Sequence, residues 1–392
     1  MRRPNTPFIA FVVLTAVLAA CAGDADRGGD APVGGVGGTV VIATAGNFAP
    51  SPPPVIFDAQ SRALADLVFD RLADIGPQMN TIGDQGFTPR LARQWEWSAD
   101  SLSIAFAIDP DARWHDGQPV RATDVRFTFD LLKDPLTASP GGPQLASLDS
   151  MTVRDSLTAV AWFSRRAPEQ FYNAVYHMHV VPEHVYRDIP RNQLNTADIA
   201  TLLVGSGPFR LARYEPSIRL ELVADTANYR GRPNLDRVIW GMTTDAGANI
   251  AQFMSGQADI MEYLPTDLLA RVDSNPNVKA VPYTGLGYAY MEMNLRHPRR
   301  NAAPHPIFSD RNVRRAISMA LDREAMHRYV FGDMGTLGAG PYPRALADSA
   351  VRLLPFDRAA AAALLDSAGW RMGSGSVREK TGRPLAFGLV VP

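Results

Sequence analysis

The sequence predicts an α/β fold with more than one folded lobe. Stretches rich in β-branched residues alternate with amphipathic helical stretches from residue 39 onward, a pattern typical of helices packed on sheets. The chain has 392 residues, of which 46% are hydrophobic. A chain of this length usually has more than one hydrophobic core. The sequence therefore supplies enough apolar surface for two or three domains.

The first predicted elements are a strand and a helix. The β-branched run at residues 39–44 predicts a strand, and a proline-rich loop follows at residues 47–54. Residues 59–72 place Leu64, Val68 and Leu72 on one face at helical spacing. We expect this helix to pack on the first strand.

A longer alternating stretch and a second helix come next. Residues 95–108 alternate between polar and apolar side chains, which predicts one half-buried strand. After a turn at residues 114–119, a helix begins at Thr123 and ends before Pro135, because the residue before a proline disfavours helical backbone. A second strand-rich stretch covers residues 150–163.

The alternation continues to the end of the chain. Further strands are predicted near residues 209, 220–222, 238–240 and 258–263, with helices at 246–255 and 266–272. Asp310 begins a helix with a clear apolar face. The helix at residues 357–367 ends at Gly369, which can adopt the left-handed conformation that terminates helices.

The first twenty residues have the organisation of a secretory signal. Basic Arg2 and Arg3 precede an apolar run at residues 8–18, and small residues follow. A spanning helix needs about 20 apolar residues, so this run is too short to be a permanent anchor. We expect residues 1–20 to be removed, and the glycine-rich residues 21–38 to form a flexible tether.

The only cysteine, Cys21, follows the small residues directly. The sequence LAAC at residues 18–21 resembles the bacterial lipobox, in which this thiol receives lipid and two or more acyl chains hold the mature protein at a membrane. The prediction is a lipid-anchored protein outside the cytoplasmic membrane, in the periplasmic space or at the cell surface. The alternative is an ordinary secretory signal with a cysteine near its cleavage site.

Composition argues against several classes of function. The net charge of −1 gives no electrostatic attraction to nucleic acid, so none is expected as a partner. With Cys21 acylated, no cysteine is left as a nucleophile or zinc ligand. The chain also lacks GxSxG, HExxH and Walker A sequences. We therefore expect neither an enzyme nor a cofactor.

Several short sequences occur in a characteristic order. The strongest is WHDGQPVRATDV at residues 114–125; the others are LARQW at 91–95, GSGPF at 205–209, NYRG at 228–231, SGQAD at 255–259 and DRNVRRAISMALDR at 310–323. Together they resemble the extracytoplasmic solute-binding proteins of peptide, dipeptide and nickel ABC transporters. His115, Asp116 and Gly117 are interpreted as a tight turn of the scaffold rather than a catalytic or metal site.

The resemblance implies a periplasmic-binding-protein-like type II fold, with two lobes and an extra subdomain in the first. The implied domains are a core lobe at residues 39–57 and 149–283, an extra subdomain at 58–148 and a second lobe at 284–392. The resemblance also implies a monomer whose two lobes close by hinge motion around a solute, which the protein then delivers to the membrane permease. Because the chain ends within an apolar stretch at residues 384–392, the second lobe is expected to be incomplete.

The resemblance also implies where a peptide-like solute binds. The implied ligand residues are Glu262, Tyr263, Gly287, Tyr290 and Glu292, with Asn47 and Phe48 as weaker candidates. In peptide-binding relatives an extended ligand pairs with such strands through its main chain. Tyr288 and Tyr290 share a strand face, and packing in a core is the alternative role for both.

Other readings stay open. His177 and His179, with Glu183 or His184, could form a metal site, and the family also carries nickel and metal chelates. A receptor-like lipoprotein that kept the fold without a transport role is a further alternative.

Overall fold

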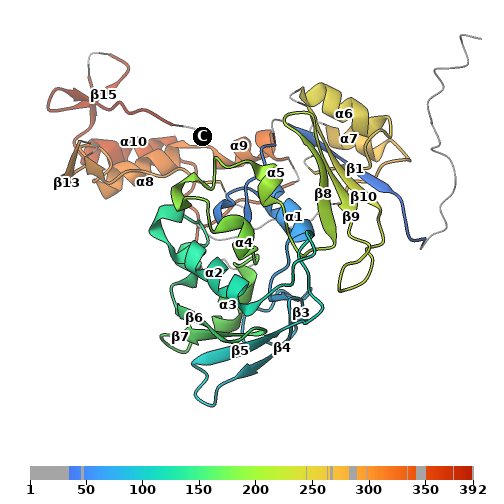
Figure 1. Cartoon of the computed structure of the whole chain (residues 1–392). Coiled ribbons are helices and arrows are strands. Elements are labelled where there is room, and N and C mark those ends of the chain that lie inside the picture. Colours follow the sequence, from blue (N-terminus) through green and yellow to red (C-terminus); the bar gives the residue numbers. More distant parts are fainter. Residues whose placement is uncertain are drawn as a thin grey trace, which may run out of the picture. The chain divides into compact units, whose positions relative to one another are not determined.

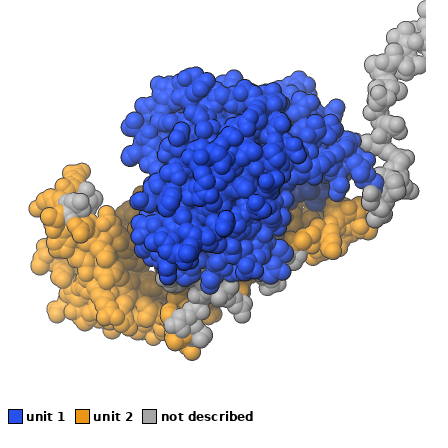
Figure 2. Space-filling model, turned by 60° about the horizontal axis from the view of Figure 1, so that its bottom comes forward, with its two compact units in different colours: residues 1–262 blue, residues 263–392 orange. Residues whose placement is uncertain are grey.

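The computed structural model describes residues 35–45, 48–243, 245–262, 264, 268–281, 289–297, 299–332, 334–340, 350–373 and 375–390 (Figure 1). The chain divides into two compact units, residues 1–262 and residues 263–392, coloured blue and orange in Figure 2. We call them unit 1 and unit 2 and describe each by itself. Within the described ranges, no helix is long and apolar enough to span a bilayer.

A mixed five-stranded sheet forms one half of unit 1 (Figure 1). Its order is β11 (Ile260–Met261), β1 (Thr39–Ala45), β10 (Arg237–Thr243), β9 (Arg219–Ala224) and β8 (Phe209–Glu215). β1 runs parallel to β10 and β11, whereas β10, β9 and β8 are antiparallel neighbours. The β-branched run predicted as the first strand is thus a central strand, where branched side chains pack well.

The first long helix, α1 (Ala59–Val68), begins and ends at identifiable residues. Asp58 caps it, since its carboxylate accepts a hydrogen bond from the Ser61 amide at 2.7 Å. The helix buries Leu64 and Val68 against the five-stranded sheet. The predicted end at residue 72 was wrong by one turn, because the backbone is already extended at Phe69.

An antiparallel four-stranded sheet forms the other half of unit 1. Its order is β4 (Ala92–Trp97), β5 (Ser103–Ile108), β7 (Thr158–Phe163) and β6 (Leu148–Asp155). The prediction of one strand across residues 95–108 was wrong: the stretch is a hairpin that turns at Ser101, whose φ is 55°. β6 and β7 of this sheet lie at and beyond residue 148, and the subdomain boundary that the resemblance implies there stays a prediction.

One helix serves both hydrophobic cores of unit 1. α2 (Ala122–Lys133) packs Phe127 and Leu131 into the core of the five-stranded sheet. It packs Val125, Phe129 and Leu132 into the core of the four-stranded sheet. Arg126, Asp130 and Lys133 form the exposed stripe of α2, and its apolar residues on the other sides contact both cores.

The remaining elements of unit 1 are short. They are β2 (Ala73–Asp74), β3 (Thr88–Pro89), α3 (Gln170–Tyr176), α4 (Glu183–Tyr186), α5 (Ile199–Leu202) and α6 (Ala246–Met254), with single 3-10 turns at Pro53–Val55, Pro135–Thr137, Gly142–Leu145 and Arg191–Gln193. Of these, α6 lies against β1 and β10.

Unit 2 contains helices and small antiparallel ribbons. Its elements are α7 (Leu269–Asp273), β12 (Arg296–His297), β13 (Arg300–Pro304), α8 (Arg311–Ala320), α9 (Arg323–Val330), α10 (Arg358–Ser367), β14 (Arg371–Met372), β15 (Arg378–Lys380) and β16 (Arg383–Pro384). α8 and α10 pack together through Ala316, Met319 and Ala361. Asp310 caps α8 as predicted, and Gly369 follows α10 with a φ of 83°.

Candidate functional site

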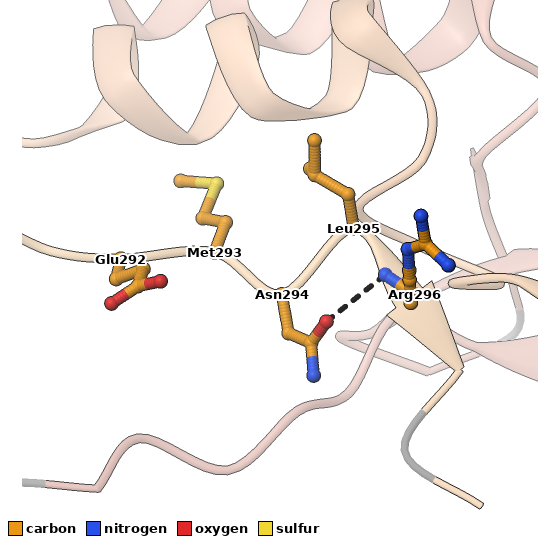
Figure 3. Close-up of a pocket in the computed structure, with 5 residues that line it drawn as sticks. All are labelled: Glu292, Met293, Asn294, Leu295 and Arg296. Carbon is orange, nitrogen blue, oxygen red and sulfur yellow. Dashed lines mark hydrogen bonds between the residues drawn. The ribbon is translucent and has the colours of Figure 1, made fainter. Parts of the chain in front are cut away.

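The stretch just before β12 belongs to no sheet within the described residues. Residues 289–295 of unit 2 are neither helix nor strand, and Figure 3 shows 292–295 as an extended run with side chains on alternating sides. Met293 and Leu295 point to one side of this run, and Glu292 and Asn294 point to the other. An open pocket with a cavity volume of about 730 Å³ lies along Glu292 to Arg296.

The main chain of this segment is largely unpaired. Within the described residues, Met291, Glu292 and Met293 make no hydrogen bond and no ion pair. Further along, the Leu295 carbonyl accepts a hydrogen bond from the His305 amide at 2.9 Å. A run of free amides and carbonyls can bind another extended chain, as an exposed sheet edge does.

Glu262, another predicted ligand residue, belongs to unit 1. It follows β11, whose Ile260 pairs with Ile42 of β1. Its carboxylate accepts a hydrogen bond from the Gln60 side-chain amide at 3.2 Å, and Gln60 belongs to the first turn of α1. Sequence reasoning missed Gln60, because no motif links two residues so far apart in the chain.

The other predicted ligand residues have different surroundings. Tyr290 is 70% exposed, so packing in a core, the alternative role, does not apply to it. Phe48 is 4% exposed and packs in the core of the five-stranded sheet, so ligand contact at this position stays a prediction. Cys21, Asn47, Tyr263, Gly287 and Tyr288 lie outside the described residues.

The three histidines considered as metal ligands have separate partners. His179 Nε2 lies 2.6 Å from Asp66 Oδ1, and His184 Nε2 lies 2.7 Å from Asp116 Oδ2. The His177 ring contacts the rings of two neighbouring tyrosines of α3 edge-on. The segment that holds His177 and His179 is not a strand.

The His115 turn is part of the scaffold. His115 Nε2 donates a hydrogen bond to the Gly207 carbonyl at 3.0 Å, and the Gly205 amide donates to His115 Nδ1 at 3.2 Å. Burial lowers the pKa of His115, which fits a neutral ring that donates from one nitrogen and accepts at the other. Gly117 completes the turn with a φ of 87°.

The family comparison decides the classification. The model of bacterial extracellular solute-binding proteins, family 5 Middle, matches residues 86–390. The chain belongs to this family. A similar protein, a putative ABC transporter peptide-binding protein of Brucella ovis, is 28% identical over 299 residues, which are 76% of this chain and 54% of that relative. The chain thus spans about half the length of the curated relatives it matches.

Two solved structures establish the fold. The oligopeptide-binding protein AppA of Bacillus subtilis, in complex with a nonapeptide, has a TM-score of 0.75 and 22% identity; the match covers 89% of this chain and 68% of AppA. NikZ of Campylobacter jejuni, in complex with Ni(L-His), has a TM-score of 0.71 and 21% identity, with 88% and 66% covered. The expected type II periplasmic-binding-protein-like α/β fold is confirmed.

Proposed function

We propose that this protein is the solute-binding component of an ABC importer and that it captures a peptide-like solute outside the cytoplasmic membrane. It then delivers the solute to a membrane permease and has no catalytic role. Membership of family 5 and the peptide-binding name of the Brucella relative support this proposal.

The observation that carries the peptide assignment is that the main chain of Met291, Glu292 and Met293 makes no hydrogen bond within the part of the chain that the structure describes. A peptide that lies beside this segment satisfies those amides and carbonyls with its own backbone. Because backbone pairing does not depend on the ligand's side chains, this arrangement favours peptides of varied sequence. The alternation of Glu292 and Met293 offers a polar side and an apolar side (Figure 3).

Each of two carboxylates, Glu292 of unit 2 and Glu262 of unit 1, by itself favours a ligand with a positive charge. Glu292 is exposed and has no cationic partner among the described residues. Glu262 is held by Gln60, a neutral amide, so this hydrogen bond leaves its negative charge uncompensated. A peptide amino terminus or a basic side chain would supply the missing cation.

Two further parts of the proposal concern closure and anchoring. The solute closes two lobes around itself and stabilises the closed form by its higher affinity for that form. Acylation of Cys21 holds the protein at the membrane through the tether at residues 21–38. In cells that export the full chain, Cys21→Ala should move the protein from the membrane fraction to the soluble fraction.

A ligand screen tests the function. The exported chain is purified, its co-purifying small molecules are identified by mass spectrometry, and its melting temperature is measured with dipeptides, oligopeptides and Ni(II)-histidine. We expect peptides to raise the melting temperature. A rise with Ni(II)-histidine alone would favour a metal-chelate carrier. No rise with any of these ligands would favour a receptor-like lipoprotein and overturn the proposal.

A further inference from the structure

Asn294 lies two residues after Glu292 in the extended run that lines the open pocket of unit 2 (Figure 3). It has no role in the capture described above, which uses the main chain of the run and the carboxylate of Glu292. Both side chains are exposed and point to the same side of the run, whereas Met293 points to the other side. Asn294 therefore shares the polar side of the run with Glu292.

A hydrogen bond fixes the orientation of the Asn294 side chain. Its Oδ1 atom accepts a hydrogen bond from the main-chain amide of Arg296 at 3.0 Å, as in an Asx turn. Because this atom faces an N–H donor, it must be the oxygen, and the Nδ2 atom points away from Arg296 (Figure 3). Among the described residues, Nδ2 donates to no acceptor. The turn thus presents two N–H donors in a fixed direction.

The charge of the pocket changes sign along its length. Glu292 brings a carboxylate to one end of the lining residues and Arg296 brings a guanidinium to the other, with the Asn294 donors between them (Figure 3). A carboxylate attracts an ammonium group, and N–H donors near a positive charge attract a carboxylate. This order of charges suits a zwitterion that lies along the run with its amino group at Glu292.

The spacing of Glu292 and Asn294 matches a ligand of two residues. Residues two apart in an extended chain lie about 7 Å apart, because each residue advances the chain by about 3.3 Å. An extended dipeptide also spans about 7 Å. With its amino group at Glu292, a dipeptide therefore places its terminal carboxylate at the Asn294 donors. A tripeptide carries its carboxylate one residue further and places a neutral carbonyl there.

We propose, on the basis of the proposed function, that Asn294 is a specificity residue of this pocket. Its Nδ2 atom donates to the terminal carboxylate of a dipeptide whose amino group lies at Glu292. A hydrogen bond to a charged acceptor is roughly twice as strong as one to a neutral acceptor. The solute class narrows accordingly, from peptides in general to dipeptides with both ends free.

The test is Asn294→Asp in the full chain. An aspartate at this position still accepts a hydrogen bond from the Arg296 amide, so the turn is kept, but it loses the donors and repels a carboxylate. Isothermal titration calorimetry measures the Kd of alanyl-leucine and of its C-terminal amide. The wild type should bind the free dipeptide about tenfold more tightly than the amide, and the variant should lose this preference. Equal effects of the substitution on both ligands, or no effect, would overturn the proposal.

Asn275 supplies the matched control. Its Oδ1 atom accepts a hydrogen bond from the Asn277 amide at 3.0 Å, so it makes the same kind of turn in unit 2, and it does not line the pocket. Asn275→Asp adds the same negative charge and should leave both dissociation constants unchanged. A loss of dipeptide affinity as large as that of Asn294→Asp would assign the effect to net charge and overturn the proposal.

A tripeptide separates the role of Asn294 from peptide capture itself. Because alanyl-leucyl-leucine places a neutral carbonyl at Asn294, its Kd should rise in Asn294→Asp no more than that of the dipeptide amide. Binding of this tripeptide without binding of the dipeptide would overturn the role of Asn294 and leave the proposed function standing. No binding of these or of longer peptides to the wild type would overturn both.

Discussion

The side-chain amide of Gln60 donates a hydrogen bond to the carboxylate of Glu262 at 3.2 Å, although 202 positions separate the two residues in the chain. This contact ties the first turn of α1 to the end of β11. It holds a carboxylate without neutralising it, which is the arrangement expected for a group that meets a cation.

Glu262→Gln should weaken binding of peptides with a free amino terminus and leave N-acetylated peptides unaffected. Exposed ion pairs are worth about 0.2–1 kcal/mol, so we expect a rise in Kd of roughly two- to fivefold. Isothermal titration calorimetry measures it. Glu96→Gln, which changes another carboxylate of unit 1, serves as the control. Equal losses for free and acetylated peptides would contradict a role for the Glu262 charge.

Met293→Pro should reduce peptide affinity because proline removes an amide hydrogen from the unpaired segment. We expect about a tenfold rise in Kd, or roughly 1.4 kcal/mol, the scale of one net hydrogen bond. Met293→Ala keeps the amide and is the matched control. If the alanine variant loses as much affinity as the proline variant, side-chain contacts rather than main-chain pairing hold the ligand.

Gly205→Ala should destabilise unit 1. A Cβ atom at this position would lie 1.7 Å from the Val68 carbonyl oxygen, so the backbone at one of the two residues must shift. Overpacking of this kind costs about 1–3 kcal/mol or more, which urea unfolding can measure. Gly375→Ala meets no atom within 4 Å and should change stability by less than about 0.5 kcal/mol. A destabilisation no larger than that of Gly375→Ala would show that the close approach is not a constraint.

His179 should make the protein less stable in acid. Burial and the nearby Arg71 lower its pKa from 6.5 to about 4, against the opposing pull of Asp66. Its contribution is therefore present above pH 6.5 and is lost as the pH falls toward 4, by up to about 3 kcal/mol. His179→Gln should flatten this part of the pH profile of unfolding, whereas His297→Gln in unit 2 should leave it unchanged. A profile unaltered by His179→Gln would refute the assignment.

The fold could be predicted well where the local pattern and the tertiary environment agree. The β-branched run that became β1, the capping Asp310 and the terminating Gly369 depend on local rules, and the structure confirms them. The prediction of one strand at residues 95–108 failed because both strands of a hairpin alternate between polar and apolar residues. Periodicity alone therefore does not reveal the turn at Ser101.

The candidate site was less predictable. The pairing of Glu262 with Gln60 and of Asp70 with Arg230 joins residues that only the completed fold brings together. His179 was considered as a metal ligand together with His177, but its Nε2 atom lies within hydrogen-bond distance of Asp66 of α1. Long-range contacts of this kind leave no periodic signal in a single sequence.

The most direct test of peptide capture is hydrogen exchange at the amides of Met291, Glu292 and Met293, measured on the full chain with and without a saturating peptide. The peptide should slow exchange at these amides, because its backbone would pair with groups that make no hydrogen bond among the described residues. A peptide that binds and leaves their exchange unchanged would contradict main-chain capture at this segment.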